Sequence, residues 1–242
     1  ELIPTPAHGI AGAAEVGEAE KHLDVLVIAF PKNIVESYVD VLRRAGLIPL
    51  ALELESQAVS RSIIPRERAA YPTIIIDIGA TSTSFIMFAA NSLIFTKTIA
   101  VGGRDFESAV ARALNTTLEE ARQIKIEVGL DKEAKNGAVF EALKLHIEAI
   151  ISELQREIWF YLDHPARRHK ALPDIGEVVL CGGDANLTGL LRFVSAAVKK
   201  AVVIGDPLVN LRLPPGVIPP IPKPQVVKYA TAIGLAMRAI GM

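Results

Sequence analysis

The segment Thr73–Phe88, TIIIDIGATSTSFIMF, constrains the fold of this chain more than any other stretch. An apolar run ends at Asp77, a turn of small and hydroxyl residues surrounds Gly79, and a second apolar run follows. Two such runs around a short glycine-containing turn predict a β-hairpin. An ordinary hairpin turn needs only Gly, Asn or Asp, so the three hydroxyls of residues 81–83 are surplus. They indicate a ligand that is rich in oxygen atoms.

Bulk composition narrows the class of protein. The chain has 242 residues, half of them hydrophobic, which is enough for one large or two small domains. The net charge of -1 argues against general nucleic-acid binding, which depends on an excess of Lys and Arg. One cysteine, Cys181, excludes an internal disulfide framework and fits a reducing cytoplasm. The sequence shows neither a signal-peptide pattern nor an apolar run near the roughly 20 residues that span a bilayer, so we expect a cytoplasmic protein that inserts no segment into the membrane.

The remaining pattern alternates between strands and helices, which predicts an α/β fold. Besides the hairpin, apolar and β-branched runs predict strands at residues 24–30, 47–54, 92–100 and 177–181. Apolar residues at helical spacing predict helices at residues 34–45, 55–64, 104–114, from Thr116 or Thr117 onward, 139–162, after the glycine pair at 182–183, and 226–240. Residues 206–225 contain seven prolines, so they form either an irregular crossing, which we favour, or a polyproline ligand.

The hairpin turn is the first candidate site. A carboxylate at a strand end, Asp77, can hold Mg²⁺ through water. The backbone N–H groups of Gly79 and Ala80 and the hydroxyls of Thr81, Ser82 and Thr83 can surround phosphate oxygens. The alternative is a polar hairpin tip without a ligand.

A second candidate is the turn Gly182-Gly183-Asp184, which follows a predicted strand. Two glycines there allow a flat ring or a sugar to lie against bare backbone, although a tight strand-to-helix turn is the simpler alternative. Lys125, on the helix between the two candidate turns, can reach a nucleotide or can be a solvated helix charge. Cys181 has no nearby His, so core packing is favoured over nucleophilic chemistry.

Together, an aspartate-ended strand, a Gly/hydroxyl hairpin and a later strand with a Gly-Gly turn resemble the actin-like ATPase fold. Within that superfamily the sequence motifs are similar to those of the PilM family of cytoplasmic type IV pilus assembly proteins, which are related to the division protein FtsA. The stretches that carry the resemblance run in family order over nearly the whole chain, at residues 1–6, 25–61, 74–88, 99–114, 118–125, 178–194 and 229–238.

The resemblance implies ATP and Mg²⁺ as cofactors, with slow or no turnover and no assigned catalytic residue. It implies a phosphate-binding hairpin at Asp77, Gly79, Ala80, Thr81, Ser82 and Thr83, with Asp77 near Mg²⁺, and an adenosine turn at Gly182, Gly183 and Asp184. Gly102, Gly103 and Lys125 are also implied to bind the nucleotide. The implied partner is the cytoplasmic N-terminal tail of a PilN-like membrane protein, at the inner face of the cytoplasmic membrane.

Compared with complete actin-like proteins, which grip phosphate with two hairpins, this chain shows one, so we expect an N-terminally truncated chain. The implied domains are residues 1–54, a remnant of the inserted subdomain of domain I; 55–70, a helix returning to domain I; 71–224, domain II; and 225–242, a packed C-terminal helix. Arg122 stands where the family usually has a Glu that contacts ribose. The alternatives are an FtsA-like division protein, a binding module that has lost ATP, and a kinase of the same superfamily.

Overall fold

The structure is a computed structural model that describes residues 25, 27–163, 173–212, 214, 216 and 220–239. The chain divides into two compact units, residues 1–52 and 53–242, and each is described by itself. The smaller unit contains α1 (Lys32–Arg44), which confirms the predicted helix. The strands predicted at 24–30 and 47–54 are wrong, because the described residues of both ranges form no strand. A strand is held by a ladder to a neighbouring strand, and neither segment has one in the described part of the chain.

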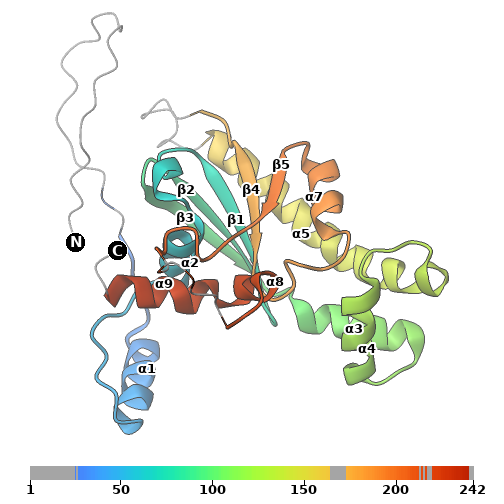
Figure 1. The fold of residues 1–242 in the computed structure, drawn as a ribbon, viewed down its shortest axis with the longest axis horizontal. Helices are drawn as coiled ribbons and strands as arrows, with labels where there is room; N and C mark the ends of the chain where they lie inside the picture. Colours follow the sequence, from blue (N-terminus) through green and yellow to red (C-terminus); the bar gives the residue numbers. More distant parts are fainter. Residues whose placement is uncertain are drawn as a thin grey trace, which may run out of the picture. The chain divides into compact units, whose positions relative to one another are not determined.

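A five-stranded sheet organises the larger unit, in the order β3-β2-β1-β4-β5 (Figure 1). The strands are β1 (Thr73–Ile78), β2 (Thr83–Ala89), β3 (Ser92–Ile99), β4 (Glu177–Cys181) and β5 (Ala201–Ile204). The first three form an antiparallel meander, and β4 and β5 run parallel to β1. The predicted hairpin and the strands at 92–100 and 177–181 are therefore confirmed, while β5 was not predicted.

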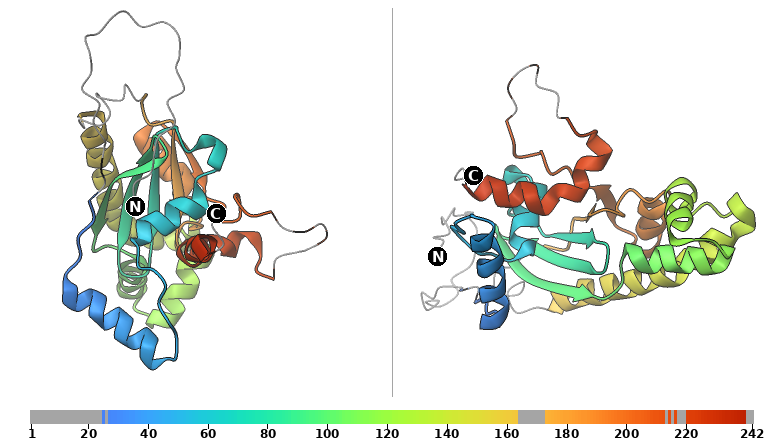
Figure 2. Two further views of the ribbon diagram at one scale, coloured as in Figure 1. Left: turned by 90° about the vertical axis from the view of Figure 1, so that its left-hand side faces the viewer. Right: turned by 90° about the horizontal axis from the view of Figure 1, so that it is seen from below.

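Helices cover both faces of this sheet, as the view in Figure 2 from below shows. The long helix α5 (Ala138–Asp163) lies along one face, and α2 (Glu55–Ile63) and α9 (Ala230–Ala239) lie on the other (Figure 2). Because β1 is covered on both sides, Ile74, Ile75 and Ile76 are fully buried although their side chains alternate between faces. This central strand ends at the edge of the sheet where the candidate site is built.

Two helices, α3 (Gly103–Leu114) and α4 (Leu118–Val128), pack against each other beyond the end of β1 (Figure 1). The start predicted for α4 is confirmed at Thr117, whose hydroxyl accepts a hydrogen bond from the N–H of Glu120. Among the described residues, the remaining α-helices are α7 (Leu190–Val198) and the short α8 (Lys223–Val226). The described part of the proline-rich segment has no strand and only the short α8, so it is irregular as expected.

Helices α2 and α9 cross at very close range. A Cβ on Gly234 would lie 1.8 Å from the carbonyl oxygen of Ala58, so only glycine allows this approach. The guanidinium of Arg61 donates two hydrogen bonds of 2.7 Å to the carboxylate of Glu53, and Arg238 donates a third of 2.6 Å. These donors hold the pKa of Glu53 below its usual range. The sequence predicts a deeply packed final helix, and the structure packs one face of it.

Candidate functional site

The tip of the β1–β2 hairpin forms a tight turn with two exposed residues. Gly79 N–H donates a 2.9 Å hydrogen bond to the carbonyl of Ser82, while Ala80 and Thr81 are exposed. The hydroxyl of Thr83 is buried and donates to the carbonyl of Val101 at 2.7 Å. Of the three hydroxyls predicted to face a ligand, this one ties the hairpin to the segment after β3, and those of residues 81 and 82 lie nearer the surface.

The glycine pair after β3 lies directly against this turn. The N–H of Gly103 donates to the carbonyl of Gly79 at 3.0 Å, and the N–H of Arg104 donates to that of Ala80 at 2.8 Å. A Cβ on Gly102 would lie 2.6 Å from the amide nitrogen of Ser82. The start of α3 is therefore locked to the hairpin tip by backbone contacts that a larger residue at 102 would prevent.

The second candidate turn reaches the same edge of the sheet. Strands β1 and β4 are parallel neighbours in which Asp77 pairs with Cys181, so the residues after both strands emerge side by side. The N–H of Asp184 donates to the carbonyl of Ile78 at 3.4 Å. Gly182 has φ +90, and a Cβ there would lie 2.4 Å from Oδ1 of Asp77. Positions more than 100 residues apart in sequence thus form one continuous edge.

The carboxyl group of Asp77 has an unusual electrostatic environment. Its pKa is raised to about 6, first by burial and then by the negative charge of Glu55, while a hydrogen bond from the Cys181 thiol acts in the opposite direction. Burial and the Asp77 charge raise the pKa of Cys181 well above its usual value, so this thiol stays protonated. The structure thus supports core packing rather than nucleophilic chemistry for Cys181.

Lys125 lies in the interior and is already paired with two carboxylates. Its side chain is 5% exposed, and its ammonium lies 2.6 Å from Oδ1 of Asp184 and 3.0 Å from Oε1 of Glu107. Arg122, one helical turn earlier, is mostly exposed, with its Nε 4.0 Å from the same Glu107 oxygen. Two roles were possible for Lys125, a nucleotide contact or a solvated helix charge, and its burial excludes the second.

Sequence reasoning missed two carboxylates of this edge. Glu55 opens α2 and accepts a 3.1 Å hydrogen bond from the Thr231 hydroxyl, and its charge acts on Asp77. Glu107, on α3, completes the ion pairs of Lys125. Both positions read as ordinary helix surface in the sequence, because the strands and helices that bring them to the site are far away along the chain.

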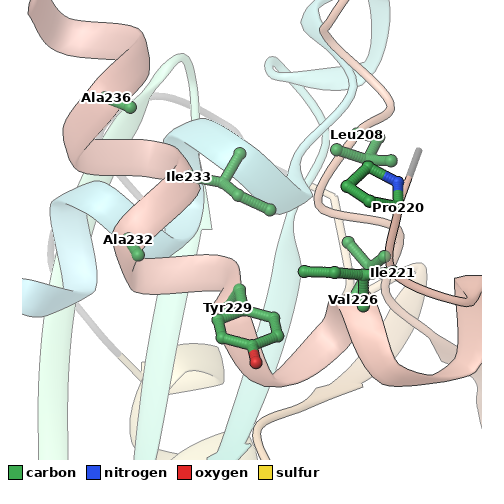
Figure 3. A pocket seen from close by; sticks show the side chains of 8 residues that line it. All are labelled: Leu208, Pro220, Ile221, Val226, Tyr229, Ala232, Ile233 and Ala236. Atoms are coloured by element: carbon green, nitrogen blue, oxygen red, sulfur yellow. The ribbon is translucent and has the colours of Figure 1, made fainter. Parts of the chain in front are cut away.

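An apolar hollow of about 340 Å³ lies elsewhere, beside α9 (Figure 3). It is lined by Tyr229, by the outer residues of α9 such as Ile233 and Ala236, and by Leu208 and Ile221 of the proline-rich segment. Its walls carry almost no polar surface, so it has none of the donors that a phosphate needs. The candidate site therefore remains the edge formed by the two turns.

The sequence matches the family description "Type IV pilus assembly protein PilM" over residues 13–240. The chain belongs to the PilM family. Its curated relatives include the cell division protein FtsA of Bacillus subtilis strain 168, 24% identical over 217 residues that cover 82% of this chain and 49% of the relative. FtsA of Pseudomonas aeruginosa is 24% identical over 234 residues, or 91% of this chain and 54% of the relative. The chain thus spans about half the length of these curated relatives.

Solved structures share the same fold. A PilM-PilN type IV pilus biogenesis complex has a TM-score of 0.67 at 24% identity, covering 85% of this chain and 57% of that one. MreB5 of Spiroplasma citri bound to AMPPNP has a TM-score of 0.66 at 14% identity, covering 88% of this chain and 66% of that one. The ethanolamine utilization protein EutJ from Carboxydothermus hydrogenoformans has a TM-score of 0.59 at 22% identity, covering 86% of this chain and 62% of that one. These similarities confirm the predicted actin-like ATPase fold.

Among the residues that the structure describes, no helix combines the length and the apolar character needed to cross a bilayer. The same part of the chain contains no group of three or more His, Cys, Asp or Glu side chains arranged to enclose a metal ion.

Proposed function

We propose that this member of the PilM family binds ATP at the edge formed by the two turns and acts as a scaffold of the type IV pilus inner-membrane platform. The single observation that carries the proposal is the contact of Asp77 with Gly182, which joins the hairpin tip and the glycine turn into one edge. In the proposal the protein works in the cytoplasm, at the inner face of the cytoplasmic membrane.

At the phosphate end, Ala80, Thr81 and Ser82 present backbone and hydroxyl groups at an exposed tip. Hydrogen bonds of Gly79 and Thr83 fix the conformation of that tip. The start of α3, at Gly102 and Gly103, packs against it, and the N–H of Gly103 donates to the carbonyl of Gly79. We assign the tip to the phosphates of the nucleotide because its exposed backbone and hydroxyl groups can donate hydrogen bonds to phosphate oxygens.

At the nucleoside end, Gly183 has no neighbour within 4 Å of the place where a Cβ would lie, so its bare backbone faces open space. We assign this surface to the adenosine part of the ligand. Lys125 and Asp184 lie at its border, paired with each other.

The acidic pair Asp77 and Glu55 fits Mg²⁺. Their mutual repulsion contributes to the raised pKa of Asp77, and a divalent cation would relieve it. When bound, the cation supplies positive charge that neutralises phosphate oxygens. Asp77, at the end of β1, is the residue that we assign to hold it through water.

The partner in this proposal is the cytoplasmic N-terminal tail of a PilN-like membrane protein. Support comes from the structural similarity to a PilM-PilN complex. Nucleotide binding would change the affinity for the tail only if the two ligands favour the same conformation of the protein.

Isothermal titration calorimetry on the full-length protein tests both ligands. ATP with Mg²⁺ is titrated first, and a synthetic peptide of the PilN tail from the same organism is titrated with and without nucleotide. The proposal expects saturable binding of both. Peptide binding without nucleotide binding would favour the alternative of a binding module that has lost ATP, for which Arg122 and the paired state of Lys125 argue.

A further inference from the structure

The side chain of Asp184 extends from the glycine turn to the start of α3. One of its carboxylate oxygens, Oδ2, is 2.0 Å from the place where a Cβ on Gly103 would be, so the carboxylate covers the bare backbone at the start of α3. Because Gly103 has no side chain, the Asp184 carboxylate can occupy this space. The neighbouring Gly183, by contrast, faces open space.

This carboxylate is held in place by Lys125. Oδ1 of Asp184 is 2.6 Å from the Lys125 ammonium, and the position of a Cβ on Gly103 is 3.4 Å from the same ammonium. Asp184 and Lys125 are 13% and 5% exposed, so the pair is shielded from water and its attraction is only weakly screened. The second partner, Glu107, approaches the ammonium at 3.0 Å from α3.

We propose that Asp184 and Lys125 form a closed latch over Gly103, and that a nucleotide must open this latch to bind fully. The inference rests on the proposed nucleotide binding and adds that a residue of the adenosine turn opposes it. While the latch is closed, the Asp184 carboxylate repels a negatively charged ligand and occupies the space between the glycine turn and α3. The ion pair with Asp184 also keeps the Lys125 ammonium from contacting the oxygens of the ligand.

Opening the latch leaves Lys125 with one protein partner instead of two. Glu107 still balances its charge, so the buried ammonium is not left unpaired while it contacts the ligand. The cost of separating Asp184 from Lys125 is subtracted from the binding free energy of every nucleotide. Removing the Asp184 carboxylate should therefore tighten binding, which is the opposite of what the loss of a ligand contact would do.

The test compares Asp184→Ala and Asp184→Asn with the parent in calorimetric titrations of ATP and ADP with Mg²⁺, using the full-length protein. We expect Asp184→Ala to bind both nucleotides about tenfold more tightly, because the charge-assisted pair with Lys125 no longer has to be broken and Gly103 is uncovered. Asp184→Asn, whose amide still covers Gly103, should show a smaller gain. Glu107→Gln is the matched control: it removes one carboxylate from the same ammonium but does not uncover Gly103, so it should give no such gain. Circular dichroism and thermal unfolding check that each variant folds.

If both Asp184 variants bind nucleotide as tightly as the parent or more weakly, the latch is wrong, but the proposed nucleotide binding stands. An equal gain from Glu107→Gln also overturns it, because the effect would then belong to the local charge and not to the space over Gly103. If the parent and both Asp184 variants are folded and none binds nucleotide, the proposed function falls and the latch falls with it.

Discussion

Oδ1 of Asp77 lies against the backbone of Gly182, 2.4 Å from where a side chain at that position would begin. The carbonyl oxygen of Ile78 is equally close, at 2.4 Å. The carboxylate at the end of β1 and the turn at the end of β4 are therefore packed together without room for one additional carbon atom. The two turns therefore form a single packed unit.

Gly182→Ala should destabilise the protein strongly. The change adds a methyl group that collides with Asp77 and Ile78 at a residue with φ +90, so we expect a loss of about 2–5 kcal/mol in the free energy of unfolding. Urea unfolding followed by circular dichroism measures it. Gly183→Ala is the control, since a Cβ at position 183 would have no neighbour within 4 Å, and its effect should stay within about 0.5 kcal/mol. Similar losses for the two variants would contradict the packing described here.

Gly183→Val separates ligand binding from folding. Because the added side chain would enter open space, the fold should be retained, but the branched group would occupy the surface assigned to adenosine. We expect ADP and ATP to bind more weakly to the same degree, with and without Mg²⁺, in calorimetric titrations. Unchanged affinity for both nucleotides in a folded variant would remove adenosine from this turn.

Asp77→Asn should have opposite effects on stability and on ligand binding. The raised pKa of Asp77 means that the native state favours the protonated carboxyl, so the stability from this group is fully present below pH 4 and is lost as the pH rises through about 6. Removing the charge should stabilise the ligand-free protein at pH 7 by up to about 3 kcal/mol and flatten the pH dependence between pH 4 and 6. Urea unfolding across this pH range measures both effects.

The same variant should lose part of its Mg²⁺-dependent nucleotide affinity, by about 1–3 kcal/mol, the usual range for one charge-assisted contact. Titrations with and without Mg²⁺ isolate the cation-dependent part. If Asp77→Asn binds ATP as the parent does under both conditions, Asp77 is a polar strand end and not a cation ligand.

Gly234→Ala probes the crossing of α2 and α9 away from the site. Its Cβ would lie 1.8 Å from the Ala58 carbonyl oxygen, so the helices would have to separate, and we expect a loss of about 2–4 kcal/mol. Thermal unfolding gives the result. Ala236→Ser, on the side of α9 that lines the apolar hollow, serves as the control and should change stability much less. A neutral Gly234→Ala would show that the crossing is looser than described.

The two turns of the candidate site could be predicted from local sequence pattern. The hairpin around Asp77 and the Gly182-Gly183 turn were visible because glycines and a strand-ending carboxylate are unusual in apolar runs. Glu55 and Glu107 were not predicted, because a Glu near the start of a helix is also what an ordinary helix contains. The burial of Lys125 was likewise unreadable, since it depends on α3, α4 and the glycine turn meeting in space.

The strand predictions at 24–30 and 47–54 failed for a different physical reason. Both runs are largely apolar, and 24–30 is also rich in β-branched residues, which matches the composition of a strand. A strand also needs a partner for its backbone groups. Composition shows whether a run resembles a strand, but it does not show whether a partner strand is available. For β5, the four residues Ala201–Ile204 are too short a run to stand out, and parallel pairing with β4 makes them a strand.

Amide chemical-shift mapping by NMR tests whether nucleotide binds across the edge formed by the two turns. Mg²⁺ and ATP are titrated into isotope-labelled protein while the amide signals of Ala80, Thr81, Gly183 and, as a reference in the apolar hollow, Ile233 are followed. The amide signals of Ala80, Thr81 and Gly183 should shift saturably with one shared affinity, and that of Ile233 should change little. Shifts confined to Ile233 and its neighbours, or no shift at any of the four amides, would contradict nucleotide binding at this edge.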